Sequence, residues 1–332
     1  MLAASLGELS RLVTPTFARN VGKRLDAVER RLGELARSDN PFVDEVSRHV
    51  IDAGGKRFRP LLVVLASMLG GGADPDRVER AALVVELTHV GSLYHDDVMD
   101  EAKLRRGIAS VNARWDNCVA ILVGDLLFSR GSSVVATLGT DYVALQASTF
   151  ARLVHGQVAE LVGPAGGEDP LEHYLRVVAD KTGSLIATSA IFGGMAAGLP
   201  TPALDALGRF GEEIGVVFQL SDDVIDVASD TSGKTPGTDL REGVSTLPAL
   251  LARRSGRPED ARLIDLLGRP LSLDAEVDEA LTLLRAHPAM DEARAYITAR
   301  AEVARSHLVP LPPGQARDAL SGLCDTVITR SA

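Results

Sequence analysis

The 332-residue chain contains only two cysteines, Cys118 and Cys324, which lie far apart and form no CxxC motif. This pattern provides neither a disulfide framework nor a thiolate zinc site, and it is typical of a protein in a reducing cytoplasm. The longest uninterrupted apolar runs are about half the length needed to cross a bilayer, so no transmembrane segment is expected. No basic segment precedes an apolar core near the first residue, so no signal peptide is expected.

Positive charge is also scarce. The net charge is −10 at pH 7, with 35 lysines and arginines against 45 acidic residues, so nucleic acid is not an expected partner. Only five of the basic residues are lysines, and three of these, Lys56, Lys181 and Lys234, lie in motif-like stretches. The remaining composition, 45% hydrophobic and 24% charged, is that of a folded globular protein.

Helical periodicity dominates the sequence. Three long segments, at 77–102, 116–138 and 207–230, are rich in Ala, Leu, Val and Glu and lack the regular alternation of half-buried strands. Clusters of glycine and proline separate such segments, and no low-complexity linker divides the chain. We therefore expect an all-α fold, a single domain over residues 1–332 built from roughly a dozen helices.

The carboxylate pattern D-D-x-x-D occurs twice, at 96–100 and 222–226. On a helix, Asp96 and Asp100 lie one turn apart. In the second segment four residues form one polar stripe: Gln219, Asp222, Asp223 and Asp226. One such pattern arises by chance in about a tenth of chains of this length, and two arise in far fewer. Like charges at this spacing repel, and all-oxygen ligands indicate that Mg²⁺, completed by a substrate phosphate, removes the penalty.

Basic residues flank the first acidic segment. The stretch "AGGKRFRP" at 53–60 contains Lys56, Arg57 and Arg59, and Arg105 and Arg106 follow the acids. Arginine forks and lysine point charges both suit phosphate oxygens. Solvated charge runs are the alternative. The basic clusters near both ends of one acidic helix favour the hypothesis that Mg²⁺ holds one diphosphate while the bases hold a second.

Eight separated motifs carry a family resemblance: "GGKRFRP", "HVGSLYHDDVMD", "RRG", "ILVGDLLFSR", "GQVAEL", "KTGSLIATS", "FQLSDDVIDV" and "GKTPGTDLREGVSTLP". In this order the chain resembles the trans-polyprenyl diphosphate synthases of long-chain type, over roughly residues 30–250. The resemblance implies a helical bundle in which the two aspartate-rich helices face each other across a deep central pocket, and usually a homodimer. It also implies a cytoplasmic, Mg²⁺-dependent prenyltransferase that joins an allylic diphosphate to isopentenyl diphosphate, head to tail.

The resemblance assigns roles to matching positions. Mg²⁺, three ions with substrate bound, is expected on aspartates of both motifs. Asp96 and Asp100, supported by Asp97, and Asp222 would bind it directly, and Asp223 and Asp226 would complete the metal site from behind Asp222. The isopentenyl diphosphate site matches Lys56, Arg59, His89 and Arg106. The allylic diphosphate site matches Arg105, Lys181, Thr182, Gln219 and Lys234. The residues expected to act in the chemical step are Asp96, Asp97, Asp100, Asp222, Lys181 and Arg105. For His89 the alternative is a polar core residue, and for Lys181 and Lys234 it is a surface lysine.

Product length is predicted from side-chain size. Gly91 and Ser92 precede Asp96 by about one to one and a half helical turns. An aromatic residue here would floor the pocket, whereas small residues leave it open, so a long product is expected, with a respiratory quinone side chain as the leading use. A short farnesyl or geranylgeranyl product is the alternative. On this interpretation Gly91→Phe shortens the product.

Some features depart from the family pattern, and three other classes of protein are alternatives to it. Val244 stands where many members have lysine, and Ala109 and Ser110 replace a frequent Pro-Thr pair. A class I terpene cyclase usually has Asn and Ser or Thr in its second metal motif. A helical phosphohydrolase needs further histidine ligands. A non-catalytic partner subunit usually lacks acidic motifs. Residues 251–332 are helical without an interpretable motif, and transient membrane contact during product release is an unsupported option for them.

Overall fold

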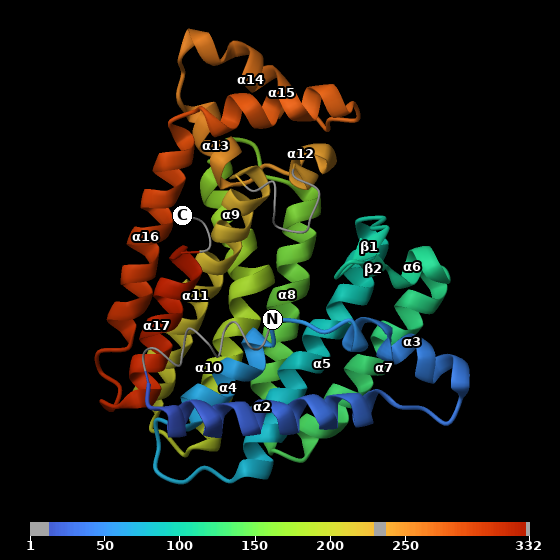
Figure 1. Cartoon of the computed structure of the whole chain (residues 1–332), viewed down its shortest axis with the longest axis vertical. Coiled ribbons are helices and arrows are strands. Elements are labelled where there is room, and N and C mark those ends of the chain that lie inside the picture. Colours follow the sequence, from blue (N-terminus) through green and yellow to red (C-terminus); the bar gives the residue numbers. More distant parts are fainter. Residues whose placement is uncertain (1–12, 229–236, 330–332) are drawn as a thin grey trace. The chain divides into compact units, whose positions relative to one another are not determined.

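The computed structural model describes residues 13–228 and 237–329, and these residues are almost entirely helical (Figure 1). Within those ranges the only strands form a two-residue hairpin, β1 (Leu104–Arg105) paired antiparallel with β2 (Ile108–Ala109). The prediction of an all-α fold is therefore confirmed. Lys234 lies outside the described residues.

Four helices begin with a capping residue followed by proline. The cap side chain accepts hydrogen bonds from backbone N–H groups of the first turn, which would otherwise have no partner, and proline in first position has no N–H to lose. The caps and their helices are Thr14 for α2 (Pro15–Ala36), Asn40 for α3 (Pro41–Asp52), Asp74 for α5 (Pro75–Met99) and Asp169 for α9 (Pro170–Val178). The starts of these helices are thus determined by the local sequence.

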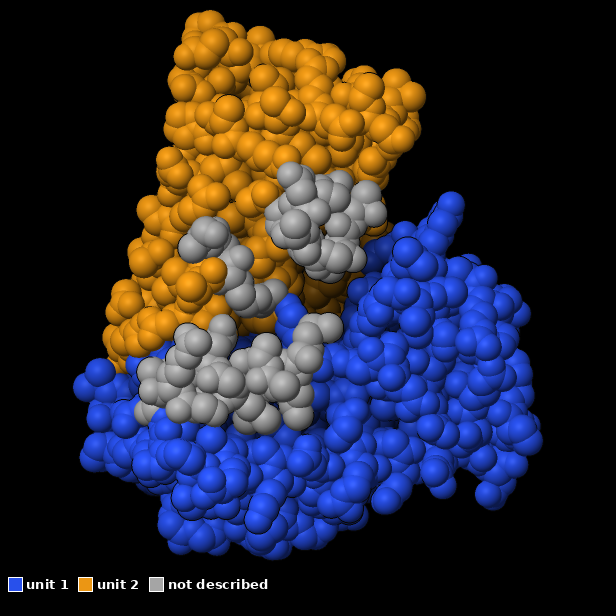
Figure 2. All heavy atoms as spheres, in the orientation of Figure 1, with its two compact units in different colours: residues 1–150, 185–211, 308–323 blue, residues 151–184, 212–307, 324–332 orange. Residues whose placement is uncertain are grey.

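The residues group into two compact units (Figure 2). Unit 1 comprises residues 1–150, 185–211 and 308–323, and unit 2 comprises residues 151–184, 212–307 and 324–332. Four helices contribute residues to both units: α8 (Thr140–Val162), α10 (Ser184–Ala196), α11 (Thr201–Ala228) and α17 (Gln315–Thr329). The first acidic motif belongs to unit 1 and the second to unit 2.

The central helix of unit 1 is α5. Its side chains between Val78 and Ser92 are buried almost without interruption, as in a helix surrounded by others. It packs most extensively on α7 and also contacts α4, α2 and α6. The bounds of the remaining helices confined to this unit are α4 (Phe58–Ser67), α6 (Val111–Arg114) and α7 (Asn117–Ala136). Buried packing therefore fixes the helix that carries the first acidic motif.

Unit 2 holds a π-helical turn and a run of short helices. The π-helix, Ala179–Gly183, follows α9 directly and leads into α10. Such turns interrupt α-helices mostly where function requires it. The other elements are α12 (Thr238–Glu242), α13 (Leu247–Arg254), a 3-10 turn (Pro258–Asp260), α14 (Ala261–Leu267), α15 (Asp274–Arg285) and α16 (Ala289–His307). The helical C-terminal segment expected at 251–332 is thus present.

One described helix, α7, is long and apolar enough to cross a membrane, with 20 residues and a mean hydropathy of 1.6. The sequence had suggested that apolar runs were too short. A third of its apolar window (33%) is buried inside the protein, the helix packs on α5, and it carries Asp125 and Arg130. A core helix of a globular protein passes the same test, so α7 is weak evidence for a membrane span.

Candidate active site

The three aspartates of the first motif are not equivalent. Asp97 is fully buried, and its Oδ1 accepts hydrogen bonds from Arg105 at 2.7 Å to Nε and 2.5 Å to Nη2. Its Oδ2 has no hydrogen-bond partner among the described residues. Burial raises the pKa of Asp97, although the hydrogen bond and the charge of Arg105 lower it. Asp96 is half-buried and Asp100 is exposed. Asp97 therefore supports the site from inside, while solvent reaches the carboxylates of Asp96 and Asp100.

These acids lie at the unfavourable end of their helix. Asp96 and Asp97 occupy the last turn of α5, and Asp100 is its C-cap. The C-terminal end of a helix carries partial negative charge, so carboxylates here repel the helix as well as one another. A bound cation would offset both effects. This placement supports the prediction that the cluster is built for a ligand rather than for stability.

A tight hairpin places the paired arginines. The two residues between β1 and β2, Arg106 and Gly107, have φ of 54° and 81°, as a type I′ turn requires. This geometry explains why glycine follows the arginines in "RRG". It lets Arg106 Nη1 donate to the carbonyl oxygens of Val50, at 2.8 Å, and of Gly54. Arg105 instead faces Asp97.

The "GGKRFR" stretch is held by a buried ion-pair network. Arg57 has φ of 48° and donates from Nε and Nη2 to Glu29, at 2.6 and 2.7 Å, and from Nη1 to Glu86 at 2.9 Å. The side chains of Arg57 and Glu86 are 4% and 2% exposed. Gly55 is packed so closely that a Cβ would lie 3.1 Å from the Arg106 guanidinium carbon. Sequence reasoning missed Glu86, although an acid inside the apolar run "LVVEL" was a usable signal.

Two further bases, Arg59 and His89, lie beside this network. Arg59 Nε is buried and has no hydrogen-bond partner in the described part of the chain. Burial lowers the pKa of Arg59 to about 10, opposed by Glu86 and reinforced by Arg106. Burial and the neighbouring arginines, Arg59 first, hold the pKa of His89 well below its ordinary value of 6.5. Lys56, the fourth residue predicted for this site, is exposed. An anion would relieve this excess positive charge.

His89 is expected to stay neutral at physiological pH. The unfolded chain takes up a proton on this residue near pH 6.5 whereas the folded protein does not, so the free energy of unfolding falls as the pH drops below that value. Denaturant unfolding at pH 7 and pH 5 should show a smaller loss for His89→Gln than for the wild type. An equal loss in both proteins, or an imidazole NMR titration near 6.5 in the folded protein, would contradict this.

The aspartates of the second motif also differ. Asp223 is 2% exposed, and its carboxylate accepts hydrogen bonds from Tyr174 Oη, from Gln219 Nε2 at 3.3 Å and from Leu247 N at 3.2 Å. Burial raises its pKa to about 6, although these donors act in the opposite direction. The oxygens of Asp223 already bind protein donors, which is consistent with its predicted position behind the direct ligand Asp222. The role of Asp223 at the metal stays a prediction. Asp222 is half-buried and remains the accessible candidate.

Asp226 joins the end of α11 to the chain that follows the undescribed segment. Its carbonyl accepts from Gly237 N at 3.2 Å, and its Oδ2 accepts from Asp239 N at 3.4 Å. Asp226 is half-buried. Val244, which replaces a frequent lysine, is 36% exposed, and its N–H donates to Asp239 O at 2.8 Å. Asp226 therefore connects the acidic stripe to the backbone of α12.

The π-helical turn presents Lys181 and Thr182, both half-buried. Lys181 Nζ lies 2.5 Å from Glu160 Oε2, which comes from the "GQVAEL" motif on α8. Gly156 of the same motif permits the contact, because a Cβ there would lie 2.7 Å from Lys181 N. The structure thus brings two motifs of unit 2 together, and Glu160 is a neighbour of the predicted site that sequence reasoning did not name.

Gly91 does not border open space. A Cβ at this position would lie 2.9 Å from the Phe128 ring and 3.2 Å from Gly124 O, because α7 crosses α5 here. The sequence prediction for Gly91 did not include this neighbour, and the effect of position 91 on product length stays a prediction. Its neighbour Ser92 is 8% exposed, and its Oγ donates to the His89 carbonyl.

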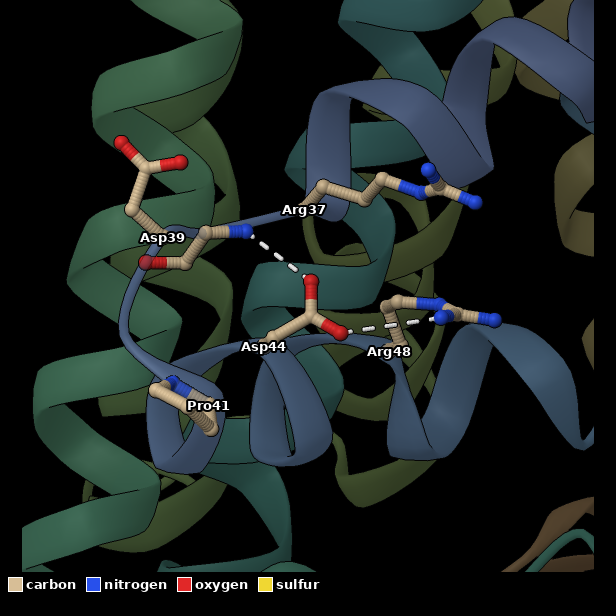
Figure 3. Close-up of a pocket in the computed structure, with 6 residues that line it drawn as sticks. Arg37, Asp39, Pro41, Asp44 and Arg48 are labelled. Atoms are coloured by element: carbon tan, nitrogen blue, oxygen red, sulfur yellow. Dashed lines mark hydrogen bonds and ion pairs between the residues drawn. The ribbon is translucent and has the colours of Figure 1, made fainter.

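One pocket in unit 1 lies apart from these motifs (Figure 3). It is lined by Arg37, Ser38, Asp39, Pro41, Asp44 and Arg48. Asp44 accepts from Ser38 N at 3.0 Å and lies 3.6 Å from Arg48, which also pairs with Asp52 at 2.9 Å. Its charges are largely neutralised internally, and it contains none of the predicted site residues.

The described acidic side chains can be compared with the ligands that the predicted Mg²⁺ requires. Across residues 13–228 and 237–329, no three His, Cys, Asp or Glu side chains converge as a ready-made cluster. Mg²⁺ normally takes only one or two carboxylates and completes its shell with water and phosphate oxygens. The accessible carboxylates Asp96, Asp100 and Asp222 fit that chemistry, since every donor is a hard oxygen. They do not form a closed protein cage.

Known proteins match nearly the whole chain in sequence and in fold. The family profile described as polyprenyl synthetase matches residues 40–284. A nonaprenyl diphosphate synthase of Mycobacterium tuberculosis is 46% identical over 316 residues, 95% of this chain and 94% of its own, and a dimethylallyltranstransferase of the same species is 41% identical over 98% of each. The crystal structure of a geranylgeranyl pyrophosphate synthase from Corynebacterium glutamicum, complexed with calcium and isoprenyl diphosphate, has a TM-score of 0.85 and 43% identity, covering 95% of this chain and 98% of that one.

The fold and the paired acidic motifs define a prenyltransferase with the all-α isoprenoid synthase fold. The chain belongs to the polyprenyl synthetase family. The prediction of this family, and with it of an enzyme that transfers prenyl groups, is confirmed. The rival terpene cyclase and phosphohydrolase interpretations are not favoured.

Proposed function

We propose that the enzyme condenses an allylic diphosphate with isopentenyl diphosphate, head to tail, to make a long all-trans polyprenyl diphosphate. The observation that carries this proposal is the partly buried cluster of Arg59, His89 and Arg106 next to Asp96 in the last turn of α5. Positively charged side chains thus lie next to the solvent-accessible carboxylates at the end of α5. A diphosphate bound directly by bases, beside one bound through a cation, matches that arrangement.

The accessible aspartates would hold the cation, which we propose to be Mg²⁺, three ions when substrate is present. Asp96 and Asp100 would bind it on α5, and Asp222 on α11. When bound, Mg²⁺ neutralises the charge that develops on the departing diphosphate. Asp97 holds Arg105 in place, and Asp223 holds Gln219. We propose that residues 1–332 act as a single polyprenyl synthase domain.

The remaining residues bind and orient the two substrates. Lys56, Arg59, His89 and Arg106 would bind isopentenyl diphosphate, with neutral His89 donating an N–H to a phosphate oxygen. Arg105, Lys181, Thr182, Gln219 and Lys234 would bind the allylic diphosphate. Breaking the allylic C–O bond leaves an allylic carbocation and inorganic diphosphate. The C=C bond of isopentenyl diphosphate attacks the carbocation, and the proton then lost passes to the released diphosphate. Fixed positive charge at the leaving group lowers the barrier, and the apolar backs of α5 and α11 help to exclude water.

The product is proposed to be long, with a respiratory quinone side chain as its use. The support is Ser92 near the metal end and the relative that is a nonaprenyl diphosphate synthase. A short product is the second candidate, because the solved relative from Corynebacterium glutamicum is a geranylgeranyl pyrophosphate synthase. Sizing the products separates the two. Three or four isoprene units would contradict the long-chain proposal.

We propose a cytoplasmic homodimer. The outer faces of α7 and α8 carry exposed apolar side chains that a second copy would cover, among them Ile121 at 42%, Leu122 at 61%, Val143 at 40% and Val158 at 55%. Such faces favour burial against a partner. Transient membrane contact for product release is a further part of this proposal. Light scattering of the purified protein measures the oligomeric state, and a monomer at all concentrations would contradict it.

Removal of the metal tests the reaction directly. Incubation with Mg²⁺, isopentenyl diphosphate and an allylic primer should give chain elongation with release of diphosphate. Addition of EDTA should abolish turnover, and excess Mg²⁺ should restore it, because Asp96, Asp100 and Asp222 alone cannot neutralise the leaving group. Release of diphosphate or phosphate without chain growth would overturn the proposed function.

A further inference from the structure

We propose that Arg152 of α8 is a positioning residue for the allylic substrate, because it fixes the π-helical turn that presents Lys181 and Thr182. The inference rests on the proposed function, in which these two residues bind the allylic diphosphate. Arg152 acts through Asp180, the residue that precedes Lys181 in the turn.

The guanidinium of Arg152 joins three segments of unit 2. From α8, its Nε and Nη2 both lie 2.8 Å from Oδ1 of Asp180 in the π-helical turn. Its Nη1 donates to Oε2 of Glu212 on α11 at 2.9 Å. A planar guanidinium that binds two carboxylates at once fixes their relative positions, which a single ammonium does not. The three side chains are 37–42% exposed, so the contact contributes geometry more than stability.

The same two helices pack directly against the backbone of the turn. Gly156 lies one helical turn after Arg152 on the same face of α8, and a Cβ there would lie 2.7 Å from Lys181 N. A Cβ on Gly183 would lie 3.2 Å from the carbonyl oxygen of Glu212 on α11. Arg152 therefore links the two helices between which the turn is packed.

The charges along α8 favour one register of the turn. Arg152 binds Asp180, and Glu160, about two turns further along α8, lies 2.5 Å from Nζ of Lys181. A π-helical hydrogen bond spans one residue more than an α-helical one, and a shift of the chain by one residue would rotate each side chain by about 100° about the helix axis. Such a shift would turn Asp180 away from Arg152 and would break the ion pair of Lys181. The two oppositely charged pairs therefore hold the direction in which Lys181 points.

Only one of these two pairs competes with the substrate. A diphosphate bound at Lys181 would compete with Glu160 for the ammonium group. The contact between Arg152 and Asp180 lies outside this competition and would hold the turn in the free and the bound enzyme. Loss of Arg152 should therefore weaken the allylic site and spare the isopentenyl diphosphate site, whose predicted residues belong to unit 1.

The test is Arg152→Met, which keeps the apolar stem and removes the guanidinium. Its kcat/KM for the allylic diphosphate should fall about tenfold, because the group that binds the diphosphate is misplaced. The KM for isopentenyl diphosphate, measured at saturating allylic diphosphate, should stay within about twofold of the wild type. Arg152→Lys should recover part of the loss, because it keeps the charge without the fork. Amide hydrogen exchange over residues 179–184 should be faster in Arg152→Met.

Two further variants separate this contact from a general effect. Asp180→Asn should cause a similar fall in kcat/KM, and the double variant with Arg152→Met should lose no more than either single variant, as for two residues that act through one contact. Arg262→Met is the matched control. Arg262 also binds two carboxylates in unit 2, Glu279 at 2.7 Å and Asp265 at 3.0 Å, and its side chain is 50% exposed. Its kinetics should equal those of the wild type.

The outcomes distinguish the positioning role from the proposed function. Unchanged kcat/KM in Arg152→Met, equal rises in both KM values, or losses that multiply in the double variant overturn the role of Arg152. If Arg152→Met does not fold, Arg152→Lys and Asp180→Asn decide. Absence of chain growth in the wild type overturns the proposed function instead, and the exchange rates then decide whether Arg152 holds the turn.

Discussion

Asp96→Asn and Asp222→Asn are each expected to lower kcat by about 100-fold or more, with little change in stability. Asparagine keeps the shape of the side chain but removes the negative charge that a hard divalent cation requires. Both aspartates are half-buried, so solvent and cations can reach them, whereas Asp97 and Asp223 are buried and accept hydrogen bonds from protein donors. Steady-state kinetics at several Mg²⁺ concentrations measure the effect, and added Mg²⁺ should recover only part of the activity.

Asp205→Asn is the control for this comparison, because Asp205 is exposed on the same helix as Asp222 but lies almost five turns away. Its kcat should equal that of the wild type. Wild-type kcat in both Asp96→Asn and Asp222→Asn would refute the role of the two motifs. Activity lost equally in Asp205→Asn would point to a general charge effect instead.

The local part of this structure could be predicted from sequence. Capping residues followed by proline mark four helix starts, and the spacing of Asp96, Asp100 and Asp222 identified carboxylates that prove accessible. These features depend on residues within one or two turns. Helical periodicity therefore gave the fold class and the positions of both acidic motifs.

The inward-facing residues could not be predicted in the same way, because each depends on a neighbour outside its own helix. Asp97 of α5 binds Arg105 of the hairpin, and Asp223 of α11 binds Tyr174 of α9. Gly91 was interpreted as open space because Phe128, 37 positions away, could not be placed beside it. The spacing of residues along a helix predicts which face of that helix they share, but not which residues of the next helix pack against them.

Arg57→Ala is expected to lower the free energy of unfolding by about 3–5 kcal/mol. The substitution leaves the Glu86 carboxylate, 2% exposed, without the guanidinium that lies 2.9 Å away. Alanine keeps the cost of the positive φ at this position, so the measured loss reports the ion pair. The same substitution should raise the KM for isopentenyl diphosphate, because the network holds the loop that carries Arg59. Denaturant unfolding and steady-state kinetics measure the two effects.

Two companion variants show whether burial is the cause. Glu29→Gln removes the half-exposed partner, whose side chain is 46% exposed, and should cost no more than about 1 kcal/mol because solvent already screens that pair. The double variant Arg57→Met, Glu86→Leu should be more stable than Arg57→Ala, since no buried charge is left unpaired. A double variant less stable than Arg57→Ala would mean that the arginine acts through packing and backbone contacts such as Ile51 O. In that case Glu86 would not be the residue that makes Arg57 indispensable, and the anion site would depend on loop shape more than on charge.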